Sequence, residues 1–286
     1  MESLAMLARE GWQLCRQHFG PEIYFSYPTQ TQAVSVTGSH CELNCAHCSG
    51  YYLKGMKPLQ ALKEGAVKAG SLLISGGCTK EGRVPVADYI DQIQKLKHNR
   101  RYNIHVGLVD DADIEKIAAV ADKVSFDFIG DSSTIREVLG LDRTVEEYAA
   151  CYKRLKESCQ VVPHICIGLH GGEIRGEYQA IKLLQELGAT AVTFIVFTPT
   201  KGTPLANCKP PSLQEVIAVL VAARKAFTAI PLQLGCMRPG GRYRQELDLW
   251  AVRSGINGIV NPVPAAVRMA GQLGLNSKRR EECCVL

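Results

Sequence analysis

Three cysteines lie close together in the sequence, at Cys41, Cys45 and Cys48. Thiolates at such short spacing can bind one soft metal ion or an iron–sulfur cluster. Three thiolates on a four-iron cluster would leave one iron free to bind a further ligand. A zinc site normally has four protein ligands, and His40 or His47 could complete one. The spacing therefore predicts a metal centre and leaves iron–sulfur and zinc chemistry open.

The chain contains 12 cysteines, which is unusual for a large protein of a reducing compartment and favours metal or redox chemistry over disulfides. Cys15, Cys151 and Cys159 lie in or next to expected helices and are interpreted as small core side chains. Six others follow or lie within expected strands, or end the chain: Cys78, Cys166, Cys208, Cys236, Cys283 and Cys284. They could hold a second iron–sulfur cluster. The favoured set joins Cys236 to Cys283 and Cys284 of a tail that folds back over the barrel mouth, and the other three are alternatives.

The final residues also fit a different role. The sequence Cys-Cys-Val-Leu follows a basic cluster, Lys278-Arg279-Arg280, and together they resemble a prenylation signal. Modification of the tail therefore stays an alternative to metal binding.

Short runs of β-branched residues alternate with amphipathic stretches along the chain. An initial helix is expected at residues 3–18. Strands are expected at residues 33–37, 71–75, 104–109, 124–129, 161–168, 191–197, 232–235 and 256–260. Helices are expected at residues 86–97, 113–120, 145–157, 178–187, 213–227, 243–254 and 264–273. The alternation predicts an α/β fold with a single (β/α)8 TIM-type barrel, complete or partial, at residues 31–275. A helical lead-in (residues 1–30) and a polar tail (residues 276–286) flank it.

Composition excludes several classes of protein. With 46% hydrophobic residues, the 286-residue chain can bury a full core without disulfides. The 33 basic and 28 acidic residues leave a net charge of +5 that is not concentrated in a stripe, so we expect no nucleic-acid partner. No apolar run approaches the roughly 20 residues of a membrane span, and the N-terminus lacks the layout of a signal peptide. We therefore expect a cytoplasmic protein with no membrane partner.

The motif Cys41-x3-Cys45-x2-Cys48 after a strand resembles the signature of the radical S-adenosylmethionine superfamily. The resemblance implies a [4Fe-4S] cluster on the three cysteines and S-adenosylmethionine on the fourth iron. It also implies reductive cleavage of that cofactor to a 5'-deoxyadenosyl radical, which abstracts a hydrogen atom from a substrate.

Further segments resemble the cofactor contacts of this superfamily. Ser75, Gly76 and Gly77 end the second expected strand like its glycine motif, although Cys78 replaces the usual acidic residue. The position commonly held by an aromatic residue is His47, which implies a backbone contact to adenine.

Two segments farther along the chain imply contacts to the nucleoside. Asp131 is similar in position to a ribose-binding residue of biotin synthase, and a helix cap is its alternative role. Ile167 and Leu169 are similar to residues that contact adenine in the superfamily's fifth-strand motif.

An arginine-rich segment follows the seventh expected strand. Arg238, Arg242 and Arg244 could bind a carboxylate or phosphate of a substrate. They could equally form salt bridges with Glu246 and Asp248.

The resemblance is strongest to the biotin synthase and lipoyl synthase branch, in particular to a subunit of a two-protein lipoyl synthase. It implies sulfur insertion into a protein-bound octanoyl chain, with sulfur from a second cluster. The expected partners are another radical S-adenosylmethionine subunit, an octanoylated carrier protein or peptide, and a low-potential electron donor. The chain lacks the N-terminal cysteine motif and the terminal Arg-Ser-Ser-Tyr of ordinary lipoyl synthases. Alternatives are a one-cluster mutase, methylase or cofactor-assembly enzyme and, more distantly, a zinc-binding adaptor.

Overall fold

The computed structural model describes residues 2–63, 65 and 67–286. One curved sheet of 11 strands runs through them in the order β11-β1-β10-β9-β8-β7-β6-β5-β4-β2-β3. Every neighbouring pair is parallel. The strands are β1 (Glu22–Ser26), β2 (Thr31–Ser35), β3 (Lys57–Pro58), β4 (Ser71–Ser75), β5 (Arg101–Val106), β6 (Lys123–Asp127), β7 (Val161–Ile167), β8 (Val192–Val196), β9 (Leu232–Leu234), β10 (Gly258–Val260) and β11 (Asn276–Arg280). The expected α/β TIM-type barrel is confirmed in its partial form.

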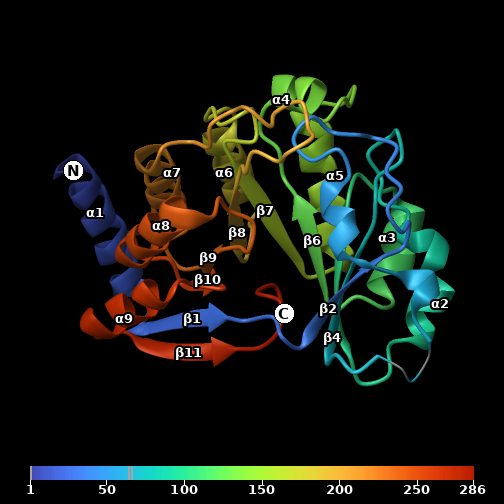
Figure 1. Ribbon diagram of the computed structural model, residues 1–286, viewed down its shortest axis with the longest axis horizontal. Helices are drawn as coiled ribbons and strands as arrows, with labels where there is room; N and C mark the ends of the chain where they lie inside the picture. Colours follow the sequence, from blue (N-terminus) through green and yellow to red (C-terminus); the bar gives the residue numbers. More distant parts are fainter. Residues whose placement is uncertain (1, 64, 66) are drawn as a thin grey trace.

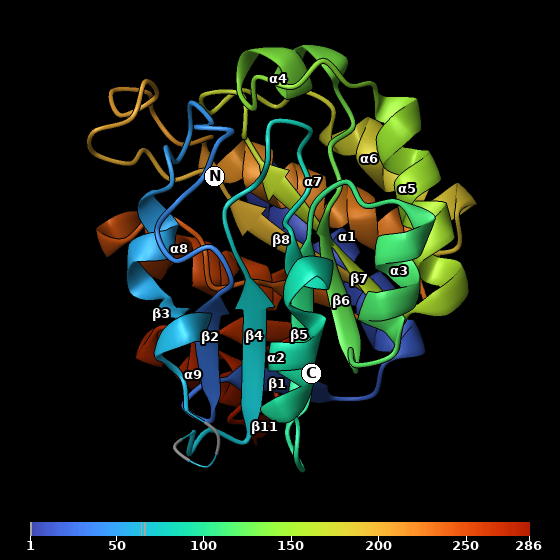
Figure 2. The same ribbon diagram turned by 90° about the vertical axis from the view of Figure 1, so that its right-hand side faces the viewer.

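Helices cover the outer side of the sheet, whereas the C-terminus lies inside its curve (Figure 1). They are α1 (Glu2–His18), α2 (Ile90–Lys95), α3 (Asp111–Ala118), α4 (Ser132–Glu137), α5 (Val145–Ser158), α6 (Glu177–Glu186), α7 (Leu213–Ala226), α8 (Gly241–Arg253) and α9 (Pro264–Gln272). In the view of Figure 2, α2 lies in front of β5, whereas α3 and α5 lie to the right of β6. No described helix is long and apolar enough to span a membrane.

Alternation along the strands separates the two faces of the sheet. On β6, Phe126 is fully buried and packs against Tyr148 and Tyr152 of α5. Its neighbours Ser125 and Asp127 therefore point to the inner face, because successive strand side chains alternate. Capping boxes fix the starts of the two longest barrel helices, with Thr144 before α5 and Ser212 before α7.

All eight expected strands are present, with ends shifted by up to three residues. The structure differs from expectation at both termini. The lead-in contributes β1, which pairs with β10 and β11 instead of with β2, and the tail begins with β11. The residues after β11 then turn beneath the starts of the central strands, where Cys283 N donates to Thr31 Oγ1 at 2.8 Å. The tail thus closes the bottom of an open barrel. The expectation that it folds over the barrel mouth is wrong, because its contacts are with the strand starts at Thr31 and Arg101.

Candidate metal centre

The three cysteines lie on the loop that follows β2, at the carboxyl edge of the sheet. Backbone bonds give this loop its shape, with Cys48 N and Ser49 N both donating to Cys45 O, at 3.2 and 2.8 Å. Ala46 N also donates to Val138 O at 2.7 Å, which ties the loop to the residues after α4. The ligand atoms of Cys45, His47 and Cys48 all lie within 4.8 Å of one another.

The thiols interact strongly because they are close and partly buried. A hydrogen bond from Cys45 and the interaction with His47 together lower the pKa of Cys48 to about 4. The same hydrogen bond and burial raise the pKa of Cys45. Cys41 and Cys78 also raise it, which places Cys78 in electrostatic contact with the predicted trio. The loop therefore presents closely spaced soft sulfur donors.

The glycines after β4 allow close packing against the cysteine loop. A Cβ at Gly77 would lie 2.0 Å from His40 O and 2.6 Å from Cys41 Cα. Gly77 N donates to Thr37 Oγ1 at 2.7 Å, and at Gly76 a Cβ would lie 3.0 Å from a methyl carbon of Val36. These contacts give the glycine motif a structural role in seating the loop. Its contact with a cofactor stays a prediction.

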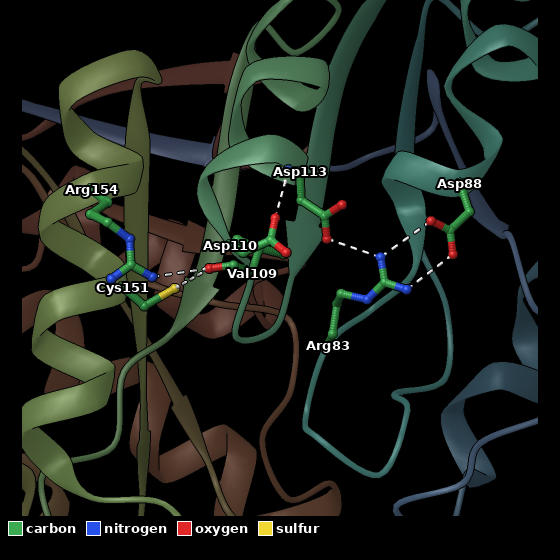
Figure 3. A network of polar contacts seen from close by, with 7 residues as sticks. All are labelled: Arg83, Asp88, Val109, Asp110, Asp113, Cys151 and Arg154. Atoms are coloured by element: carbon green, nitrogen blue, oxygen red, sulfur yellow. Dashed lines mark hydrogen bonds and ion pairs between the residues drawn. The ribbon is translucent and has the colours of Figure 1, made fainter.

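The chain that continues after Cys78 is anchored by a polar network (Figure 3). Arg83 bridges Asp88 and Asp113, with distances of 3.1 and 3.0 Å. Asp110 accepts a hydrogen bond from Asp113 N at 2.9 Å and so caps α3. Cys151, an expected core thiol, is buried in the same region and donates to Val109 O.

Three polar side chains line the inner face of adjacent strands, and the sequence analysis did not select them as site residues. His105 of β5 lies 3.3 Å from Asp127 of β6, and its Nδ1 lies 3.4 Å from Ser75 Oγ of β4. His164 of β7 is the register partner of Asp127, and its ring lies 6.0 Å from that of His105. Alternation of polar residues with buried apolar ones along these strands was the signal that could have identified them.

Asp131 lies at the N-terminus of α4. Its Oδ2 accepts hydrogen bonds from Thr134 N and Thr134 Oγ1, both at 2.7 Å, and from Ser133 Oγ at 2.5 Å. These bonds lower the pKa of the carboxyl. The structure thus gives Asp131 the capping role that was its alternative, and ribose binding stays a prediction.

The other predicted nucleoside contacts lie on or just after β7. Ile167 is fully buried in the main core, whereas Leu169 lines a small cavity together with Cys166 and Gly176. Adenine binding by this pair stays a prediction.

The candidates for a second cluster separate into groups. Cys283 and Cys284 lie in the tail inside the barrel, and both interact electrostatically with Cys236 above β9. Asn103 Nδ2 donates to Cys283 Sγ at 3.5 Å. Cys284 is buried in a small apolar cluster with Val285 and Val162.

The three alternatives lie elsewhere. Cys78 neighbours the trio, Cys166 is on β7, and Cys208 lies beside Gly171. Cys236, Cys283 and Cys284 are therefore the candidates that the fold brings near one another. Metal binding by this set stays a prediction.

The arginine segment forms the salt bridges that were its alternative role. Arg238 and Asp248 form a fully buried bidentate pair at 2.7 and 2.9 Å. Arg242 is 91% exposed and pairs with Glu246. Arg244 Nη2 donates to Asn261 O at 3.0 Å. Anion binding by these arginines stays a prediction.

Two observations test whether the loop suits a metal centre. Thiols are the donors that soft metals and iron–sulfur clusters prefer, and three of them lie on one short loop. His47 Nδ1 is buried and has no hydrogen-bond partner among the described residues. The residues therefore fit a soft metal centre, and the ring nitrogen of His47 could serve as a ligand to zinc.

No protein-family model and no curated protein sequence matches the chain. Solved structures do match. The methylornithine synthase PylB has a TM-score of 0.67 at 14% identity, over 98% of this chain and 90% of that chain. The hydrogenase maturase HydG from Carboxydothermus hydrogenoformans also has a TM-score of 0.67 at 14% identity, over 96% and 71%. Streptococcus suis SuiB bound to S-adenosylmethionine has a TM-score of 0.54 at 14% identity, over 82% and 58%.

These three proteins are radical S-adenosylmethionine enzymes. At this identity the likeness concerns the fold and not the substrate, because one fold supports many reactions. The chain therefore has a partial α/β-barrel fold like that of these three proteins.

Proposed function

We propose that this protein is a radical S-adenosylmethionine enzyme that binds a [4Fe-4S] cluster through Cys41, Cys45 and Cys48. The observation that carries the proposal is the position of the three thiols. They lie on the loop after β2, at the carboxyl edge where enzymes of this barrel type hold their active sites. Zinc binding by Cys45, His47 and Cys48 is the competing use of the same loop, favoured by their 4.8 Å clustering.

The chain's own residues would hold and orient the cofactors. When bound, the cluster and S-adenosylmethionine would supply a 5'-deoxyadenosyl radical for hydrogen abstraction. Gly77 lets the end of β4 pack directly on the cysteine loop. Tyr52 hydrogen-bonds Thr200 at 3.0 Å and so links the residues after the cysteine loop to the loop that follows β8. The sheet and the tail surround the inner face on which a substrate would react.

Anaerobic reconstitution with iron and sulfide tests this proposal. We expect at least four irons per chain, absorbance at ~400 nm, and 5'-deoxyadenosine on addition of S-adenosylmethionine and dithionite. Cys45→Ala should abolish all three signals. Cys159→Ala is the matched control, because Cys159 ends α5 on the outer side, and it should retain them. A colourless protein that retains one zinc and forms no 5'-deoxyadenosine would refute the proposal.

Sulfur insertion into a protein-bound octanoyl chain is a second, narrower candidate. It is favoured by the position of Cys283 and Cys284, whose tail enters the barrel and interacts electrostatically with Cys236. A hydrogen bond from Cys284, together with the backbone of Val285 and the side chain of Asn103, lowers the pKa of Cys283 to about 6. Such thiols could hold the second cluster that a sulfur donor needs.

An octanoylated carrier peptide tests the narrower candidate, with the protein assayed alone and with a partner subunit. About eight irons per chain and a thiolated peptide are the expected results. The variant Cys283→Ala/Cys284→Ala should keep 5'-deoxyadenosine formation and lose the thiolated product. About four irons in the wild type, or unchanged sulfur transfer by the variant, would refute this candidate.

A further inference from the structure

The inner face of strands β4 to β7 is unusually polar for a barrel. Interiors of barrels of this class are filled mainly by branched apolar side chains. Here the inward positions on four consecutive strands include Ser75, His105, Ser125, Asp127 and His164. Several of these groups pair with one another or with neighbours, since His105 contacts Ser75 and Asp127. Ser125 donates to Asn103 Oδ1 at 2.8 Å. A ligand would meet the polar atoms that these contacts leave exposed.

Asp127 lies at the centre of this polar face. Its side chain is 53% exposed although the residue belongs to an interior strand. Its ion-pair partner within the described residues is His105, through Oδ1. Interaction with His105 and His164 lowers the pKa of Asp127 to about 2, so the carboxyl is ionised at neutral pH. Asp127 thus presents an ionised carboxylate whose second oxygen His105 does not occupy.

The flanking histidines have defined hydrogen-bonding roles. His164 Nδ1 lies 3.1 Å from Val162 O, and because a carbonyl only accepts, Nδ1 carries the proton. In the neutral ring Nε2 is then an acceptor. His105 Nε2 donates to Asp127, and its Nδ1 faces the hydroxyl of Ser75. The groups left to meet a ligand are therefore acceptors: a carboxylate oxygen of Asp127 and Nε2 of His164.

The position of this acceptor pair fits a substrate. Asp127 interacts electrostatically with His47 and with Cys78 of the candidate metal centre above it. Below it, His105 interacts with Cys283 of the tail. A group held at Asp127 would thus lie between the cysteine loop and the floor of the barrel.

We propose that Asp127, flanked by His105 and His164, binds a protonated amine or amidinium group of a small polar substrate. This inference deepens the proposed function and rests on it for the claim that the bound molecule is a substrate. Hydrogen-bond donors with positive charge match the exposed carboxylate and imidazole nitrogen. An alkyl chain would desolvate these groups without replacing their hydrogen bonds, so the site favours an amine over the octanoyl chain of sulfur insertion.

Binding of 1,4-diaminobutane to the reconstituted protein loaded with S-adenosylmethionine tests the inference. Calorimetry and saturation-transfer NMR compare this diamine with 1,4-butanediol and succinate, which match its length without positive charge. We expect the diamine to bind at least ~10-fold more tightly than either, and Asp127→Asn to weaken it by ~10-fold or more. His164→Phe should weaken it by a smaller factor.

Asp111→Asn is the matched control, because Asp111 is an 80% exposed carboxylate on an outer helix that pairs with Arg154. It should bind the diamine as the wild type does. Equal binding of diamine and diol, or unchanged affinity in Asp127→Asn, would overturn the inference. Formation of 5'-deoxyadenosine by the wild type is measured separately. Diamine binding through Asp127 without that product would refute the proposed function and keep the amine site.

Discussion

Replacing Arg238 by methionine is expected to destabilise the protein by about 3–5 kcal/mol. Both side chains of the Arg238–Asp248 pair are 0% exposed. The guanidinium also donates to Gly235 O at 2.6 Å, and Asp248 Oδ2 accepts from Val263 N at 3.0 Å. Methionine keeps much of the apolar volume but leaves Asp248 as an unpaired buried charge, and breaking one side of such a pair typically costs about 3–5 kcal/mol.

The loss is large relative to a total stability of about 5–15 kcal/mol. At roughly 2–4 °C per kcal/mol for a large domain, it corresponds to a fall in Tm of roughly 6–20 °C. Circular dichroism at one scan rate measures it on the metal-free protein, which separates folding from cofactor binding. Arg242→Met is the control: Arg242 is 91% exposed and pairs with Glu246 one turn away, so it should change stability by less than about 1 kcal/mol.

The double variant Arg238→Met/Asp248→Leu identifies the cause. If an unpaired charge produces the loss, removing both charges should restore part of the stability. Recovery should be incomplete, because Gly235 O and Val263 N lose their partners and each unsatisfied buried group costs about 1–3 kcal/mol. The reasoning is refuted if Arg238→Met is no less stable than Arg242→Met, or if the losses of the two single variants simply add.

Three further predictions concern the site. Gly77→Ala should lower both the stability and the iron content per chain, because its Cβ would lie 2.0 Å from His40 O. The control Gly20→Ala should change neither, because its Cβ would meet nothing within 4 Å. Equal iron content in the two variants would contradict this prediction. Asp131→Ala should cost about 1 kcal/mol in urea unfolding through loss of the α4 cap, and a purely capping role predicts an unchanged KM for S-adenosylmethionine. Burial lowers the pKa of His164 from 6.5 to about 4, so the stability that neutral His164 contributes is present above pH 6.5 and declines as pH falls toward 4. In His164→Gln the stability should fall less over that range, and an unchanged pH profile would refute the assignment.

The order of the eight barrel strands was predictable because each buries a run of apolar residues between polar turns. The edge strand β11 was not predictable in this way. Its sequence, Asn-Ser-Lys-Arg-Arg, has four exposed positions and one of intermediate exposure, and its pairing with β1 rests on backbone hydrogen bonds. Edge strands rich in charge carry no hydrophobic pattern, so the segment had the composition of a tail.

The candidate site likewise has one part that the sequence predicts and one part that it does not. The cysteine loop was predictable because its chemistry depends on three residue types at fixed spacing in one segment. The polar face was not, because Ser75, His105, Asp127 and His164 come from four strands and meet only through the sheet register. A histidine or aspartate alone within a strand gives no spacing signal, and only its alternation with buried neighbours shows which face it occupies.

The tail joins the edge strand β11 to the floor of the barrel, beneath the polar inner face. Cys284 and Val285 pack on Val162 and Val260 inside the barrel, so the last residues supply apolar contacts where the inner face would otherwise be open. Arg101, the first residue of β5, forms a salt bridge with Glu282 and so fixes the same segment. The tail therefore closes the floor of the barrel, while the inner face above it keeps its exposed carboxylate at Asp127. An acyl chain would need the apolar lining that here is covered by the tail, whereas a charged amine needs the acceptors that the tail leaves free.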